Sequence, residues 1–235
     1  MEEKRTCEEM EERIRLLEAH LSTLAGGIAH DFNNILSAIL GYTELAMGEL
    51  PADCRPYRNL QEVLGGVDRA RDTVKRVIAF SRAGAEGERA IPASAPATGD
   101  SGRAAEDGGE DMPRGTERIL LIDDEPSLTR LGKQMLERIG YEVTAHTDSR
   151  AALELVEADP DRFDVVITDQ TMPDLTGTAL AGKLAALRSE LPVIICTGNG
   201  DRRHEEEARR VGVKAFVRKP YSERTLAGVV RSVLD

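Results

Sequence analysis

The sequence predicts an α-helical domain followed by a doubly wound α/β domain with a five-stranded parallel sheet. In the first 84 residues, apolar side chains recur at spacings of three, four and seven, which is typical of helices packed along a seam. From residue 116 onward, short β-rich runs alternate with helical patterns, as in parallel α/β proteins. Residues 85–115 are rich in small, polar and charged side chains, which indicates a disordered linker.

Residues 1–22 are dense in Glu and Arg around a narrow apolar stripe and predict a lead-in helix. The stripe continues with seven-residue spacing as far as Ile35. Pro51 and Pro56 cannot lie in a helix interior, so we expect a turn there that joins the two helices of a hairpin. A lone hairpin buries too little apolar surface to be stable. We therefore expect residues 8–84 to form a homodimeric four-helix bundle.

Five β-rich runs are the predicted strands of the second domain, residues 116–235. They are residues 119–122, 142–145, 164–168, 193–196 and 215–217. The third and fourth runs are continuously apolar, which suits strands that are buried on both faces of a sheet. In a doubly wound sheet, the ligand site lies beyond the carboxyl ends of the strands, where the winding direction reverses.

Composition argues against several classes of function. An excess of 42 acidic over 31 basic residues, with a net charge of -11, disfavours binding to the phosphate backbone of nucleic acids. No apolar run approaches the ~20 residues of a membrane span, and residues 1–5 lack the apolar core of a signal peptide. We therefore expect a cytoplasmic protein without a membrane partner. Cys7, Cys54 and Cys196 lack metal-ligand spacing, so neither a disulfide framework nor a zinc site is expected.

One histidine stands beside an acid in the first predicted helix, in the segment HDFNN of residues 30–34. His30 lies just off the apolar seam, so its ring should point sideways toward solvent with its nitrogens available to a partner. A neutral imidazole is nucleophilic near cell pH. Together with residues 24–27 before it and 41–42 after it, the segment resembles the phosphoacceptor motif of sensor histidine kinases.

The resemblance covers about residues 8–84 and implies a dimerisation and histidine-phosphotransfer domain. It makes His30 the phosphorylated side chain and Asp31 the acid that orients the imidazole and accepts its proton. Asn34 lies one helical turn further on. It matches the polar position that helps to place an attacking water when such a domain works as a phosphatase.

Three carboxylates follow predicted strands of the second domain. Asp123 and Asp124 follow the first strand and Asp169 ends the third, so all three should meet at the carboxyl edge of the sheet. Oxygen ligands of this kind suit Mg²⁺, which keeps positions open for phosphate oxygens at phosphoryl-transfer sites. Without a metal, clustered carboxylates repel one another, so we expect raised pKa values in this cluster.

The residues around these acids resemble the motifs of a response-regulator receiver domain, which has a flavodoxin-like fold, and the match covers residues 116–235. The matching positions are Asp123 to Pro126, Asp169 with Met172, Pro173 and Gly177, then Thr197 and Gly198, and Phe216 before Lys219 and Pro220. This pattern disfavours the alternative in which the acids only cap helix N-termini.

On that resemblance, Asp169 is the nucleophile that takes a phosphoryl group as an acyl phosphate. The implied ligands of Mg²⁺ are Asp123, Asp124, Asp169 and the backbone carbonyl of Thr171. The Lys219 ammonium supplies a second cation, and the Thr197 hydroxyl can donate to a phosphoryl oxygen. The peptide bond between Lys219 and Pro220 matches the family's site of a cis bond, which would aim the ammonium inward.

Hybrid histidine kinases carry an ATP-binding domain between these two modules, but the linker here is shorter than the about 50 residues that a domain needs. We therefore expect no ATP-driven phosphorylation by this chain alone, and a sensor kinase, response regulator or phosphotransfer protein as its partner in trans. The leading hypothesis is a phosphorelay between His30 and Asp169. One alternative is a binding module switched by phosphorylation of Asp169, whose hairpin only dimerises. Another is a phosphatase of phosphorylated receivers that uses Asn34.

Overall fold

The computed structural model describes residues 2–85, 112–198 and 202–235. Most of the predicted linker lies outside the described residues. The chain divides into two compact units, of which the first comprises residues 1–29 and 72–111, and the second comprises residues 30–71 and 112–235. The second unit holds all the candidate site residues of both predicted domains.

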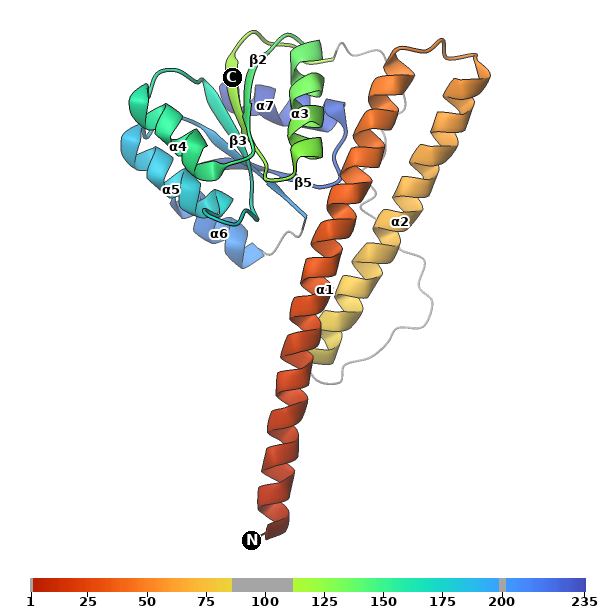
Figure 1. The fold of residues 1–235 in the computed structure, drawn as a ribbon, viewed down its shortest axis with the longest axis vertical. Coiled ribbons are helices and arrows are strands. Elements are labelled where there is room, and N and C mark those ends of the chain that lie inside the picture. Colours follow the sequence, from red (N-terminus) through yellow and green to blue (C-terminus); the bar gives the residue numbers. More distant parts are fainter. Residues whose placement is uncertain (1, 86–111, 199–201) are drawn as a thin grey trace. The chain divides into compact units, whose positions relative to one another are not determined.

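Two long helices form the amino-terminal part of the chain, as Figure 1 shows. α1 spans Glu2–Gly48 and α2 spans Arg55–Ala85. Pro51 lies in the turn between them and Pro56 lies in the first turn of α2, where its missing N–H costs no helical hydrogen bond. The predicted helical hairpin is confirmed. In the described part of the chain, neither these helices nor any shorter one has the length and apolar character that crossing a membrane requires.

The carboxy-terminal part contains a five-stranded parallel sheet with the strand order β2-β1-β3-β4-β5. The strands are β1 (Arg118–Ile122), β2 (Glu142–His146), β3 (Val165–Asp169), β4 (Val193–Thr197) and β5 (Val213–Arg218). β2 lies on one side of β1 and the later strands lie on the other, so the winding direction reverses between β1 and β3. The predicted doubly wound fold is confirmed, with its switch point at the carboxyl ends of β1 and β3.

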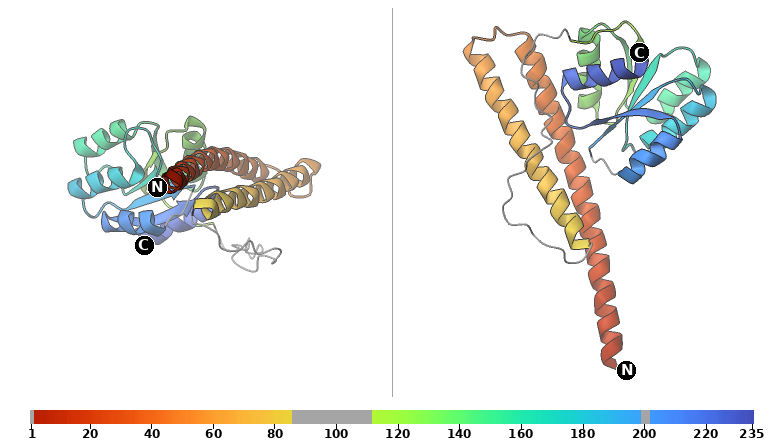
Figure 2. Two further views of the ribbon diagram at one scale, coloured as in Figure 1. Left: turned by 90° about the horizontal axis from the view of Figure 1, so that it is seen from below. Right: turned by 180° about the vertical axis from the view of Figure 1, so that it is seen from behind.

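Helices cover both faces of this sheet (Figures 1 and 2). They are α3 (Pro126–Arg138), α4 (Ser149–Ala158), α5 (Gly177–Leu187), α6 (Arg202–Arg210) and α7 (Glu223–Leu234). Neighbouring residues of a strand point to opposite faces, so Leu120 packs with Val156 and Leu180 of α4 and α5. Leu121 packs on the other face, in the apolar cluster that contains Leu226 of α7. Strands buried on both faces explain the continuous apolar runs in the sequence.

Local signals fix the helix ends near the carboxyl edge of the sheet. Glu125 caps α3, because its carboxylate accepts hydrogen bonds from the backbone N–H and the hydroxyl of Ser127. The hydroxyl of Thr176 caps α5 in the same way. Gly140 follows α3 with a φ of 106°, a left-handed conformation that glycine adopts without strain. The loops after β1 and β3 are therefore held by the helices that follow them.

Candidate functional site

Two carboxylates and a lysine meet at the carboxyl edge of the sheet. Asp123 directly follows β1, Asp169 is the last residue of β3, and Lys219 directly follows β5. The Lys219 Nζ lies 2.7 Å from Asp123 Oδ2 and 2.6 Å from Asp169 Oδ1. All three residues are buried. The parallel sheet thus brings together side chains that are nearly 100 positions apart in the sequence.

Backbone N–H groups hold the other oxygen of each carboxylate. Glu125 N donates to Asp123 Oδ1 at 3.0 Å, and Thr171 N donates to Asp169 Oδ2 at 2.6 Å. Each carboxylate is therefore fixed between a backbone donor and the Lys219 ammonium. Fixed charges of this kind need little reorganisation when a phosphoryl group arrives.

Three further predicted features surround this cluster. The peptide bond between Lys219 and Pro220 is cis, as the resemblance implied. Thr197 ends β4 and is buried, and its carbonyl accepts a 2.8 Å hydrogen bond from Lys219 N. Asp124 follows Asp123 and is only partly buried. All of these residues lie at the carboxyl edge of the sheet.

Burial dominates the electrostatics of the acids. It raises the pKa of Asp123, while the Lys219 ammonium opposes the shift and the Asp169 charge adds to it. Burial also raises the pKa of Asp124, and the Asp169 charge is the second cause. The raised pKa values expected for clustered carboxylates are confirmed for these two acids, but burial outweighs the repulsion from Asp169. Burial would lower the pKa of Lys219, yet the neighbouring carboxylates raise it overall, so the lysine stays charged.

The α1 segment of residues 30–34 contacts the acidic cluster. The Asn34 side-chain oxygen accepts a 3.4 Å hydrogen bond from Lys219 Nζ. The Asn33 side-chain amide donates at 3.0 Å to the carbonyl of Gly198, which directly follows β4. Two consecutive asparagines thus connect the helix that carries the histidine to the ends of two strands.

His30 is less exposed than the seam geometry predicted, and this expectation is corrected. Its side chain is 27% exposed, and its Nε2 is buried without a hydrogen-bond partner among the described residues. Its Nδ1 lies 3.4 Å from Asp31 Oδ1. A charge on His30 is close enough to lower the pKa of Asp124 against the larger effect of burial. The prediction considered α1 alone, whereas the carboxyl edge of the sheet lies against the same flank of the helix.

Sequence reasoning gave no role to Asn33, although its side chain is almost fully buried. Asn33 lies three residues after His30 and therefore shares a helix face with it, which is the signal that could have identified it. A Cβ at Gly198 would lie 3.0 Å from the Asn33 amide nitrogen. The absence of a side chain at Gly198 therefore allows the asparagine to reach the backbone there.

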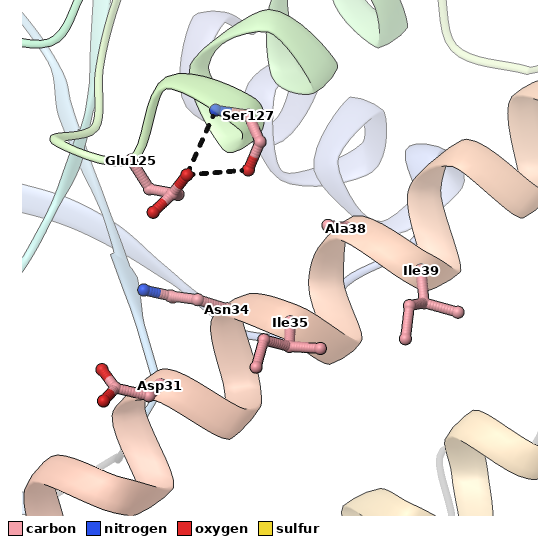
Figure 3. A pocket seen from close by; sticks show the side chains of 7 residues that line it. All are labelled: Asp31, Asn34, Ile35, Ala38, Ile39, Glu125 and Ser127. Carbon is pink, nitrogen blue, oxygen red and sulfur yellow. Dashed lines mark hydrogen bonds between the residues drawn. The ribbon is translucent and has the colours of Figure 1, made fainter.

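An open pocket of about 420 Å³ adjoins this segment, between α1 and the start of α3 (Figure 3). Its lining residues are Asp31, Asn34, Ile35, Ala38, Ile39, Glu125 and Ser127. Figure 3 shows the α1 residues along one side of the pocket and the hydrogen-bonded pair of Glu125 and Ser127 on the other. The pocket lies beside the carboxylate cluster and reaches it through Asn34.

The acids fit Mg²⁺ by the chemistry of their donor atoms. Among the described residues, no group of three or more His, Cys, Asp or Glu side chains is placed to hold a metal ion, so Asp123, Asp124 and Asp169 are not brought together as a ready set of ligands. Mg²⁺ is usually held by one or two carboxylates and fills its remaining positions with water and phosphate oxygens. Burial, with a smaller contribution from the Asp169 charge, raises the pKa values of Asp123 and Asp124 and so disfavours their ionised forms. A divalent cation would supply positive charge that favours the ionised forms.

Both parts of the chain match known families. Residues 20–86 match the His Kinase A (phospho-acceptor) domain, and residues 119–231 match the response regulator receiver domain. The sensory transduction protein RegX3 of Mycobacterium tuberculosis is 35% identical over 116 residues, which cover 49% of this chain and 50% of RegX3. A two-component response regulator of Arabidopsis thaliana is 31% identical over 117 residues, which cover 50% of this chain and 21% of that protein.

A solved structure of a response regulator receiver domain protein from Clostridium thermocellum is 31% identical, with a TM-score of 0.48, and the match covers 50% of this chain and 94% of that one. The chain spans half or less of the length of the two curated relatives described above. The phospho-acceptor match includes His30, and the receiver match includes Asp123, Asp169 and Lys219. The chain therefore joins a histidine kinase phospho-acceptor domain to a response regulator receiver domain, the two domain types of two-component His-Asp signalling.

Proposed function

We propose that this chain passes a phosphoryl group directly between His30 and Asp169 of the same molecule. The contact between Asn34 Oδ1 and Lys219 Nζ carries this proposal, because it joins the helix of the histidine to the cation that binds Asp169. The Nε2 of His30, which has no hydrogen-bond partner among the described residues, is the ring atom that we assign as the site of phosphorylation. Holding both groups in one geometry replaces a bimolecular encounter with a reaction inside one molecule.

The proposed transfer is a substitution at phosphorus. A carboxylate oxygen of Asp169 attacks the phosphorus of Nε2-phosphohistidine, the phosphorus–nitrogen bond breaks, and a phosphorus–oxygen bond forms. With a proton on Nδ1, the ring leaves as neutral imidazole, and Asp31 beside Nδ1 holds that proton. During transfer, the Lys219 ammonium offsets negative charge on the phosphoryl oxygens, and the Thr197 hydroxyl donates a hydrogen bond to one of them. The reverse reaction returns the group from Asp169 to His30.

Receiver domains generally bind Mg²⁺ at the acidic site. Here we assign Asp123, Asp124, Asp169 and the carbonyl of Thr171 as its ligands. When bound, the ion supplies positive charge to the phosphoryl oxygens. The protein side chains orient the acceptor and supply the second cation.

Histidine kinase phospho-acceptor domains typically dimerise, and receiver domains interact with kinases or response regulators. For this chain we propose a homodimer through residues 8–84 and a kinase in trans as the ATP-dependent source of phosphate. Large apolar side chains on α1 are exposed at spacings of three and four residues, and exposed stripes of this kind mark association surfaces. They include Leu24, Ile28, Phe32, Ile35 and Ile39.

The homodimer predicts twice the chain mass in solution. Light scattering on the purified chain at micromolar concentration measures this mass directly. Replacing Ile28 and Ile35 by lysine should convert the dimer to a monomer, because charges would then face each other across the seam. Replacing the exposed Leu187 of α5 by lysine is the control and should leave the dimer intact, because Leu187 lies outside residues 8–84. A wild-type chain that remains monomeric would contradict the dimer.

A labelling experiment tests the relay. The purified chain is incubated with Mg²⁺ and labelled acetyl phosphate, and the label is assigned to phosphohistidine or acyl phosphate by its stability to acid and alkali. We expect label on both residues in the wild type, on Asp169 alone in His30→Ala, and on neither in Asp169→Ala. Label confined to Asp169 in the wild type would instead support a binding module switched by phosphorylation. ATP alone should give no label.

Mixing two variants tests whether transfer stays within one chain. His30→Ala keeps only Asp169, and Asp169→Ala keeps only His30. If transfer occurs inside one molecule, the mixed heterodimer labelled with acetyl phosphate should show no phosphohistidine. Phosphohistidine formed at the wild-type rate in the mixture would show transfer between subunits.

Asn34 favours a second candidate function, hydrolysis of the acyl phosphate on Asp169. Its side chain reaches Lys219, so it could place a water against a phosphoryl group on Asp169. If so, Asn34→Ala should lengthen the lifetime of the acyl phosphate roughly tenfold or more, since misplacing a reactant costs up to about a hundredfold in rate. If the lifetime of the acyl phosphate were unchanged and transfer stayed intact, the hydrolytic role of Asn34 would be excluded and only the relay would be supported.

A further inference from the structure

We infer that Glu44 of α1 is a positioning residue for the proposed transfer, and that it holds α1 against the receiver most tightly when it carries a proton. The inference rests on the proposed transfer between His30 and Asp169 and adds a dependence of that reaction on pH. Glu44 lies fourteen residues beyond His30, or about 21 Å along the helix, so it contacts no reacting atom.

Glu44 binds the beginning of the last receiver helix. Its Oε2 accepts a 3.0 Å hydrogen bond from the backbone N–H of Glu223, the first residue of α7. The first N–H groups of a helix have no partner within that helix, and its dipole favours a carboxylate there. The next residue of α1, Leu45, packs with Ala38 against an apolar cluster of α3 that consists of Leu128, Leu131 and Met135. Glu44 therefore connects α1 to α7 beside an apolar contact with α3.

The carboxylate of Glu223 is buried, and only one of its oxygens has a partner. Arg138 of α3 donates to Glu223 Oε2 at 2.8 Å, whereas Glu223 Oε1 is buried with no hydrogen-bond partner among the described residues. A buried oxygen without a donor destabilises the contact that contains it. The bond to Glu223 N places the carboxyl group of Glu44 beside Glu223, so a proton on Glu44 would supply a donor for that oxygen.

One guanidinium serves both carboxylates and the end of α1. Arg138 pairs with Glu223, and it also lies against Gly48, the last residue of α1, because a Cβ there would lie 3.0 Å from Arg138 Cζ. α1 has no basic residue in its last turn, so the Arg138 charge offsets the partial negative charge of that helix end. Two carboxylates with one shared cation retain an excess negative charge, and a proton on Glu44 removes it.

Two charged groups face Glu44 from the helices packed against it, Glu223 of α7 and Arg138 of α3. Within one turn on α1 itself, Tyr42 is the other titratable residue. Burial raises the pKa of Glu44 above the ordinary value of a carboxyl group. The hydrogen bond from the N–H of Glu223 opposes this rise, the Glu223 charge adds to it, and the Arg138 charge opposes it.

The sign of the pH dependence follows from these contacts. If α1 leaves the receiver, Glu44 becomes exposed and returns to its ordinary pKa. The docked state therefore binds the proton more tightly than the undocked state. Docking is strongest below the ordinary pKa and weakens as pH rises through the raised one. Weaker docking moves His30 away from Asp169, so transfer should weaken in the same direction.

Hydrogen exchange of the Glu223 N–H in the full chain measures docking without any phosphoryl group. At each pH, the exchange rate is compared with that of an unstructured chain. In the wild type, the protection should fall by up to about tenfold per pH unit as pH rises between the two pKa values of Glu44, which is the limit for one proton. Glu44→Ala should lose the protection at every pH, because the acceptor is removed.

Glu44→Gln separates the proton from the contact. Its carbonyl still accepts from the Glu223 N–H and its amide donates without titrating, so its protection should stay high at every pH. Glu49→Gln is the matched control, because Glu49 is an exposed acid in the turn directly after α1, and it should behave like the wild type. Protection that persists in Glu44→Ala, or that changes with pH equally in the wild type and Glu44→Gln, would overturn the inference.

Phosphohistidine formed from labelled acetyl phosphate and Mg²⁺ tests the effect on transfer. The ratio of the wild-type rate to that of Glu44→Gln should fall as pH rises, because the ratio cancels the pH dependence of the chemistry itself. A ratio that stays constant while the protection changes would overturn the positioning role. Absence of phosphohistidine from the wild type at every pH would overturn the relay, and hydrogen exchange would still decide whether Glu44 binds α7 in a proton-dependent way.

Discussion

Replacing Lys219 by methionine is expected to lower the free energy of unfolding by about 3–5 kcal/mol at neutral pH and to slow phosphorylation of Asp169 by about 10²–10³-fold. The Lys219 ammonium lies within 2.7 Å of both Asp123 and Asp169, and all three side chains are buried. Methionine fills a similar volume but leaves the carboxylates facing each other without that cation. The arriving phosphoryl group also lacks the positive charge that the Lys219 ammonium would have placed beside its oxygens.

The stability loss should depend on pH. Burial already raises the pKa of Asp123, and the Lys219 ammonium opposes that rise. Without the lysine, the pKa of Asp123 rises further above its unfolded value, so the folded variant binds protons more tightly than the unfolded chain. Its stability is then greatest at acid pH and falls as pH rises from the unfolded carboxyl pKa through the raised folded one. The difference from wild type should therefore be larger at neutral than at acid pH.

Urea unfolding at acid and neutral pH measures this dependence, and labelling by acetyl phosphate measures the rate. Lys214→Met is the matched control, because Lys214 lies on β5, the strand that Lys219 directly follows, and is exposed. Its effect on stability should stay within about 0.5 kcal/mol. Equal losses in the two variants, or a Lys219→Met protein with wild-type labelling, would contradict the assigned role of the ammonium.

The sequence predicted the sheet and the acidic cluster because both depend on local patterns. Continuous apolar runs indicate strands such as Val165–Asp169 that are covered on both faces, and parallel strands present their carboxyl ends at one edge. Asp123 and Asp169 could therefore be placed together without knowledge of any tertiary contact. The cis bond before Pro220 followed only from the family resemblance, since no local pattern identifies it.

The contact between α1 and the receiver could not be predicted in this way. Helical periodicity shows which residues share a face of α1, but it does not show what covers that face. His30 was therefore expected to face solvent, and Asn33 received no role although it is hydrogen bonded to Gly198. Gly41 looked like an ordinary helical glycine until Leu131 was found against it. Contacts between distant segments need the folded structure to be recognised.

Replacing Gly177 by alanine is expected to lower the free energy of unfolding by about 1–3 kcal/mol and to slow phosphorylation of Asp169 by about 10²-fold. Gly177 is the first residue of α5, and its N–H donates at 3.0 Å to the Gln170 carbonyl. A Cβ on Gly177 would lie 2.5 Å from the backbone oxygen of Asp169 and 3.2 Å from the Gln170 Cα. These neighbours are backbone atoms, so no side-chain rotation can relieve the collision.

The loop after β3 must therefore shift, and the Asp169 carboxylate would shift away from Lys219 with it. Gly182→Ala is the matched control within α5, because its Cβ would meet Val211 Cβ at an ordinary 3.8 Å. Its better helix propensity should raise stability by about 0.5–1 kcal/mol without changing the rate. Urea unfolding and acetyl phosphate labelling distinguish the two variants. If Gly177→Ala also gained stability and kept its rate, the close approach of α5 to the acceptor would not matter for the reaction.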